Sequence, residues 1–141
     1  MSSVKLIPLL LLSLLAGCSD ERASFYIAGS DHALSVVRQQ QFFWEKKAEF
    51  ILVAARMPDC MRRHHLGSAP LDSRIEVYSP GNDAWIVKQG KRMFVTETRT
   101  CEGFAKLDAE PEGGTGPLVG TFEDQAGKLV FVPAPAAPAA R

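Results

Sequence analysis

A series of short β-rich segments, separated by turn residues, constrains the fold of this chain more than any other feature of its sequence. Apolar and polar residues alternate in 74–78, which is typical of a strand with one buried face. Residues 84–88 and 92–100 are rich in β-forming side chains and flank Gln89-Gly90-Lys91, which is typical of a hairpin loop. This pattern predicts antiparallel pairing of consecutive strands.

The same pattern continues toward both ends of the globular region. Residues 118–122 and 129–132 are expected to form a last strand pair, preceded by a polar, glycine-rich loop at 108–116. Near the beginning, Phe25-Tyr26-Ile27 favours a first strand. We therefore expect a mainly β fold in a single domain over 25–132, either a small antiparallel sandwich or an open barrel.

The segment 33–57 permits two interpretations. Its beginning, 34–38, contains two adjacent valines and favours a strand, whereas 45–57 is rich in Ala, Glu, Lys and Leu, which favour a helix. Residues 50–55 are apolar at every position, which fits a strand buried on both faces or a helix buried all round. We expect a hairpin of two long strands, with a helix within 42–57 as the alternative.

Residues 1–17 have the composition of an export signal. Lys5 gives a positive start, and the apolar run 6–15 is shorter than the about 20 residues that span a membrane. Leu15-Ala16-Gly17-Cys18 then resembles the lipobox of bacterial prolipoproteins. The resemblance implies cleavage before Cys18, attachment of diacylglycerol to its sulfur, and stable anchoring to a membrane.

Short segments on either side of the expected domain, 18–24 and 133–141, are not expected to belong to its core. Ser19 stands where an Asp would retain such a lipoprotein in the inner membrane of enteric bacteria, so the resemblance implies the outer membrane, facing the periplasm. We expect 18–24 to be a lipidated tether. Residues 133–141 are almost entirely Pro and Ala, which predicts an extended, disordered tail.

The charge of the chain argues against one class of partner. The precursor has 16 basic and 16 acidic residues, and loss of Lys5 with the signal leaves one more acidic than basic residue. A nucleic-acid binder would normally be basic, so we expect no nucleic-acid partner.

Two cysteines remain once Cys18 is assigned to lipid, and these are Cys60 and Cys101. An even pair in an oxidising periplasm is most simply a disulfide. Two buried free thiols and a metal site are the alternatives.

A metal site would have to be built around Cys60. His64 has ligand-like spacing from Cys60, Asp59 is adjacent, and Cys101 and Glu102 could supply further ligands for zinc. The two neighbouring histidines diverge in any regular element, however, so at most one could join Cys60. We expect instead a loop fixed by the disulfide, with no metal and no cofactor.

The run Arg62-Arg63-His64-His65 is a basic patch. Its groups suit phosphates of lipid A or carboxylates of peptidoglycan, because the arginine fork matches planar anions. Histidine would strengthen such contacts at mildly acid pH. A solvated surface without a ligand is the alternative.

The remaining polar residues form no catalytic motif that the sequence makes recognisable. Three histidines and no Gly-x-Ser-x-Gly predict no serine triad, and the spacing of Glu97, Glu102 and Asp108 does not establish a glycosidase pair. We assign no catalytic residue.

The run Gln41-Phe42-Phe43-Trp44 places three aromatic side chains near an expected turn. We expect them in the core, whereas an exposed turn would be a docking site.

The sequences Ala-Arg-Met-Pro-Asp-Cys, ending at Cys60, and Thr-Arg-Thr-Cys-Glu-Gly-Phe, around Cys101, resemble small uncharacterised lipoproteins of Gram-negative bacteria. That resemblance implies no activity. We expect a non-enzymatic envelope lipoprotein that binds a protein partner as an accessory or assembly factor. The alternatives are an inhibitor-like domain acting on a cell-wall-degrading enzyme, and a periplasmic hydrolase.

Overall fold

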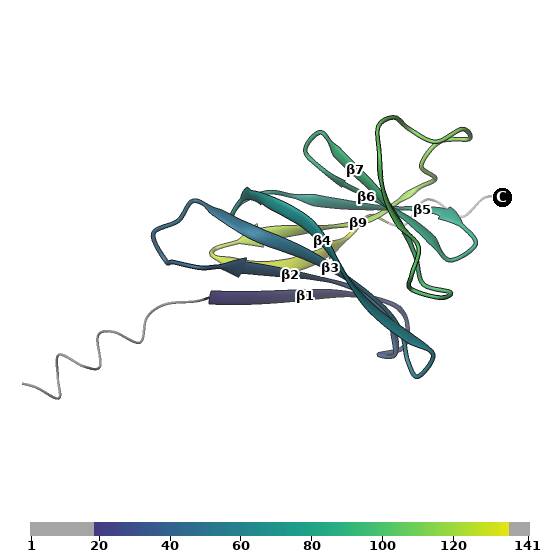
Figure 1. Ribbon diagram of the computed structural model, residues 1–141, viewed down its shortest axis with the longest axis horizontal. Helices are drawn as coiled ribbons and strands as arrows, with labels where there is room; N and C mark the ends of the chain where they lie inside the picture. The colour runs from purple at the N-terminus through teal and green to yellow at the C-terminus, as the bar shows by residue number, and fades with distance from the viewer. Residues whose placement is uncertain (1–18, 136–141) are drawn as a thin grey trace, which may run out of the picture.

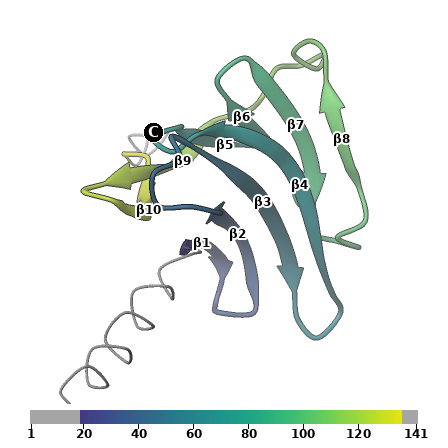
Figure 2. The ribbon, with the colours of Figure 1, turned by 60° about the vertical axis from the view of Figure 1, so that its left-hand side comes forward.

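The computed structural model describes residues 19–135, which form ten strands and contain no helix. The strands make two antiparallel sheets, one in the order β1-β2-β3-β4 and one in the order β10-β9-β5-β6-β7-β8 (Figures 1 and 2). The expected mainly β fold is confirmed, as a small sandwich of two sheets that do not close into a barrel. The bounds are β1 (Ser19–Ala28), β2 (His32–Gln40), β3 (Lys47–Arg56), β4 (Cys60–Pro70), β5 (Ile75–Gly81), β6 (Ala84–Gln89), β7 (Arg92–Glu97), β8 (Phe104–Leu107), β9 (Leu118–Gln125) and β10 (Lys128–Pro133).

The segment with two interpretations is a hairpin of two strands, β2 and β3. β3 contains the whole apolar run 50–55 and pairs with β2 on one side and β4 on the other. Its even-numbered apolar residues face the core between the sheets, while Ile51 and Val53 form a second buried cluster with Val37 on the opposite face. Burial on both faces explains the missing periodicity. The alternative of a helix within 42–57 is wrong.

Two segments expected to be irregular are strands. β1 begins at Ser19, which pairs with Gln40 of β2, so the expected tether over 18–24 is wrong from residue 19 onward. The expected loop around Cys60 is a short turn followed by β4, an edge strand of eleven residues. Residues 62–65 of β4 are polar, and the first six residues of the strand are exposed or only partly buried, because an edge strand has one neighbour. Hydrophobic periodicity therefore gave no sign of it.

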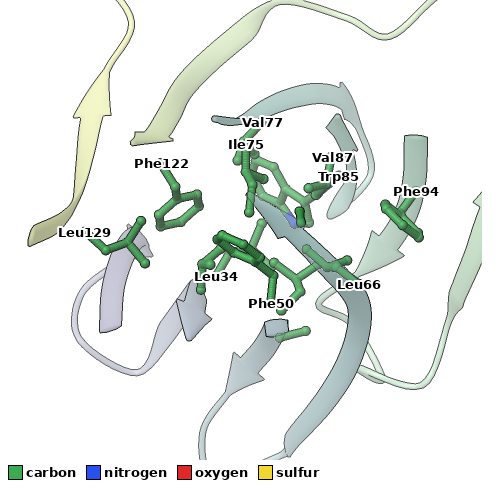
Figure 3. Close-up of a cluster of buried hydrophobic side chains, with 14 of the residues drawn as sticks. Leu34, Phe50, Leu66, Ile75, Val77, Trp85, Val87, Phe94, Phe122 and Leu129 are labelled. Atoms are coloured by element: carbon green, nitrogen blue, oxygen red, sulfur yellow. The ribbon is translucent and has the colours of Figure 1, made fainter. Parts of the chain in front are cut away.

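The main core lies between the two sheets (Figure 3). Phe25 of β1 contacts Trp85 of β6 edge-on at 5.7 Å between ring centroids, and it packs against Phe131 of β10 at 4.9 Å. Both sheets therefore contribute aromatic rings to one continuous cluster. The buried members drawn and labelled in Figure 3 are Leu34, Phe50, Leu66, Ile75, Val77, Trp85, Val87, Phe94, Phe122 and Leu129.

A different bond joins the sheets at each end of the sandwich. At one end, which we call the disulfide end, Cys60 is bonded to Cys101. At the other, which we call the Arg38 end, the buried Arg38 donates hydrogen bonds to the carboxylate of Asp124 at 2.7 Å and to the carbonyl oxygens of Leu71 and Gly127. Arg38 thereby joins β2 to the loop after β4 and to the turn between β9 and β10.

Removal of the charge at Asp124 is expected to loosen the Arg38 end in a pH-dependent way. The Arg38 guanidinium, helped by the Gly127 N–H, lowers the pKa of Asp124 below its ordinary value of 3.8. A lowered pKa in the folded state stabilises the fold fully above the ordinary value, and this stabilisation is lost as the pH falls through the lowered value. Asp124→Asn should therefore reduce the free energy of unfolding by about 1.5 kcal/mol at pH 7.

Urea denaturation of wild type and variant at neutral pH and below pH 4 measures this difference, which should shrink in acid. Asp72→Asn, on an exposed side chain of the neighbouring loop, is the matched control and should change little. A difference that stays constant through the acid range would contradict the role given to the Arg38–Asp124 pair.

Candidate functional site

Cys60 and Cys101 form the disulfide that the sequence predicts. The loop that carries Cys101 is organised by Glu97, whose carboxylate accepts hydrogen bonds from three backbone N–H groups and from the hydroxyl of Thr100. Burial raises the pKa of Glu97, but these hydrogen bonds outweigh burial and lower the pKa to about 2. Glu97, considered above for glycoside hydrolysis, is thus an ionised acceptor that shapes the loop beside the disulfide.

The basic run at the beginning of β4 is divided between the two faces of the sheet. Side chains alternate along a strand, so Arg62 and His64 point to one face of the sheet and Arg63 and His65 to the other. On the outer face, His65 lies 3.9 Å from the carboxylate of Glu49. The strand therefore divides the four residues of the predicted anion patch into two pairs, and anion binding by either pair stays a prediction.

The pair on the inner side has structural contacts. Arg62 forms an exposed ion pair with Glu102 at 3.1 Å. The ring of His64 stacks on Phe104 with 4.6 Å between centroids, and its Nε2 donates to the carbonyl oxygen of Cys101 at 2.9 Å. His64 therefore contacts and supports the disulfide loop.

Within residues 19–135, no group of three or more His, Cys, Asp and Glu side chains is arranged to hold a metal ion. The disulfide occupies the two thiols that the alternative zinc site would have used. Over the same range, no helix is long and apolar enough to cross a membrane. The export signal, Cys18 and positions 136–141 of the expected tail lie outside the described residues.

The aromatic residues 42–44 are exposed, so their expected place in the core is wrong. β2 ends at Gln40 and β3 begins at Lys47, so these residues form a loop beyond the end of the sheet. Phe43 is 72% exposed and Trp44 is 64% exposed, and these exposed fractions are far larger than those of core residues. The sequence alternative, a docking site on an exposed turn, remains as a hypothesis for this loop.

A second group of exposed apolar side chains surrounds a hollow on the outer face of the four-stranded sheet. Tyr26 of β1 is 61% exposed and Met61 of β4 is 57% exposed, and Met57 lies in the turn before β4. The hollow has a volume of about 330 Å³. Its lining residues are Arg22, Ser24, Tyr26, Ser30, Asp31, Ala33, Ser35, Ala55, Met57 and Met61.

The floor and the rim of this hollow differ in chemistry. The floor includes the buried Ala33 and Ser35, and the Ser35 hydroxyl lies 2.7 Å from that of Ser24. The rim carries one charge of each sign, on Arg22 and Asp31. The hollow can therefore accept an apolar side chain between Tyr26 and the methionines while polar neighbours meet the rim charges.

Sequence reasoning missed the hollow because it depends on the shape of the whole sheet. β1 and β4 are the two edge strands, roughly 14 Å apart if the sheet were flat. Side chains from both line the same hollow, because the sheet is bent (Figure 2). The sequence signal was limited to Met57 and Met61, two large apolar residues in a polar stretch around Cys60, since Tyr26 lies between the apolar Phe25 and Ile27.

Comparison of the chain with protein-family models, with curated proteins and with solved structures gives no match.

Removal of the disulfide is expected to destabilise the end of the sandwich that carries the hollow. The bond closes a loop with a sequence separation of 41, and in the chain-entropy model this stabilises the fold by about 4 kcal/mol. In urea denaturation, the free energy of unfolding of a Cys60→Ser, Cys101→Ser double variant should be lower than that of wild type by this amount. Wild type treated with a reductant should show the same loss. Equal urea midpoints with and without the bond would contradict this expectation.

Proposed function

We propose that this protein is a lipid-anchored envelope protein that catalyses no reaction and binds a protein partner in the hollow on the outer face of the β1–β4 sheet. The lipobox resemblance at 15–18 supports the anchor and, with Ser19, an outer-membrane location facing the periplasm. One observation carries the binding role. Tyr26, Met57 and Met61 expose large apolar surfaces around a single hollow with a partly polar floor.

The chemistry of these side chains favours a protein segment as the occupant. Tyrosine offers a rigid apolar ring with a polar tip, and methionine adapts its unbranched chain to the shape of an inserted group. Exposed apolar side chains scattered singly are normal, whereas a group of them around a hollow marks an interaction site. The expected occupant is an extended segment that inserts one apolar side chain and places polar neighbours against Arg22 and Asp31.

The position of the hollow suits an anchored protein. Tyr26 lies seven residues along β1 from Ser19, which corresponds to roughly 24 Å along an extended strand. Lipid attached at Cys18 would hold the Ser19 end of the sheet at the membrane. The hollow would then face the periplasm at a distance where a soluble or membrane-bound partner can reach it.

Photo-crosslinking in intact cells tests the proposed function. A photoreactive amino acid at Ser30, on the rim of the hollow, should give one major adduct with an envelope protein. The adduct should disappear when Tyr26→Ala and Met61→Ala are combined, and the purified complex should weaken by about 10- to 100-fold.

Leu118→Ala is the matched control for this experiment. Leu118 is an exposed apolar residue on β9 in the other sheet, so its removal should leave the adduct unchanged. Loss of the adduct in Leu118→Ala would contradict binding in the hollow. A partner that still binds the Tyr26→Ala, Met61→Ala double variant would contradict it as well.

A further inference from the structure

We propose that the loop between β2 and β3, residues 41–46, is a second membrane contact whose aromatic rings enter the headgroup region of the bilayer beside the lipid on Cys18. This inference rests on the proposed lipid anchor. It assigns a function to the aromatic cluster Phe42, Phe43 and Trp44, which we call the aromatic loop cluster, and it specifies how the anchored protein is oriented.

The aromatic loop cluster is a preformed apolar surface. Phe42 stacks on Trp44 at 4.8 Å between ring centroids, and Phe43 meets Trp44 edge-on at 5.0 Å. A hydrogen bond from the Glu45 N–H to the Phe42 carbonyl oxygen, 3.0 Å long, closes a backbone turn over residues 42–45. Three rings are thus gathered at the tip of a loop while remaining exposed, an arrangement that ordinarily requires an apolar neighbour.

Gln40 connects this loop to the N-terminal end of β1. Its side-chain amide donates to the carbonyl oxygens of Phe43 at 3.2 Å and Glu45 at 2.8 Å. Its backbone lies opposite Ser19 in the β1–β2 ladder. Paired residues of an antiparallel ladder are about 5 Å apart, so Ser19, the residue that follows Cys18 in the sequence, lies next to Gln40.

This proximity makes a bilayer the occupant that the observations favour. Figure 1 shows the beginning of β1 and the β2–β3 loop at the same end of the sheet. Lipid on Cys18 would bring that end to the membrane surface, so the nearest apolar phase for the rings is the bilayer itself. Tryptophan is enriched at membrane interfaces, where its ring is partly buried and its N–H stays hydrated.

The charges beside the rings are mixed, with a cationic pair directly following them. Lys46 and Lys47 are both exposed and can contact lipid phosphates, each contributing about 1 kcal/mol near an anionic surface. Glu45 precedes them and Asp20 lies nearby on β1, so the aromatic rings rather than net charge supply the specificity of the contact. Acyl chains alone would hold Cys18 but leave the domain free to tilt, whereas a second contact would fix its direction.

Tryptophan fluorescence tests this inference on the full lipidated chain in vesicles of phosphatidylethanolamine and phosphatidylglycerol with brominated acyl chains. The chain has two tryptophans, and Trp85 is only 6% exposed in the core. Wild type should lose about half of its emission, because Trp44 alone reaches the bromine atoms. Trp44→Phe retains an aromatic ring in the loop and should lose almost none.

A second variant separates loop insertion from general closeness to the membrane. Met61→Trp in the Trp44→Phe background places a reporter at the disulfide end, and its emission should remain unquenched.

Wild type that sediments with the vesicles but is not quenched would overturn the loop contact while leaving the lipid anchor intact. The aromatic loop cluster would then be assigned to a protein partner. A chain that does not sediment with the vesicles would overturn the anchor as well. Equal quenching at positions 44 and 61 would show a domain lying flat and would also overturn the inference.

Discussion

The pairing of β1 with β2 fixes the start of the described chain at one end of the four-stranded sheet. Ser19 lies opposite Gln40, so the strand adjoining Cys18 is built into the sheet from its first described residue. Because the four strands of this sheet are antiparallel neighbours in chain order, successive loops alternate between its two ends. The β2–β3 loop therefore lies at the end of the sheet where β1 begins, which is the end that the proposed lipid would anchor, and the turns beside the hollow lie at the opposite end.

Different bonds join the two sheets at the two ends of the sandwich. Arg38 joins three segments at the Arg38 end through one ion pair and two carbonyl oxygens. At the other end, the disulfide and the Glu97 hydrogen bonds fix the Cys101 loop beside β4. Covalent closure there keeps the turn carrying Met57 and the beginning of β4 in place, so a partner would meet a preformed surface.

The parts of the fold that the sequence predicts are those with local signals. Alternation and turn residues identified β5, β6, β7, β9 and β10, and the cysteine count identified the disulfide. The remaining features depend on the assembled sheet. β4 is a polar edge strand, the aromatic loop cluster extends past the end of β2, and the hollow requires side chains from both edges of a bent sheet. Local periodicity contains no information about any of these three.

Spin labels at the two ends of the β1–β4 sheet would test the proposed anchoring and orientation of the protein most directly. Labels introduced as Phe43→Cys and Met61→Cys in the lipidated chain on vesicles would be compared for relaxation by oxygen, which concentrates in the bilayer, and by a water-soluble nickel chelate. The label at position 43 should favour oxygen, and the label at position 61 should favour nickel. Equal preference for nickel at both positions, or the reverse order, would contradict a sheet anchored through Ser19 and the aromatic loop cluster.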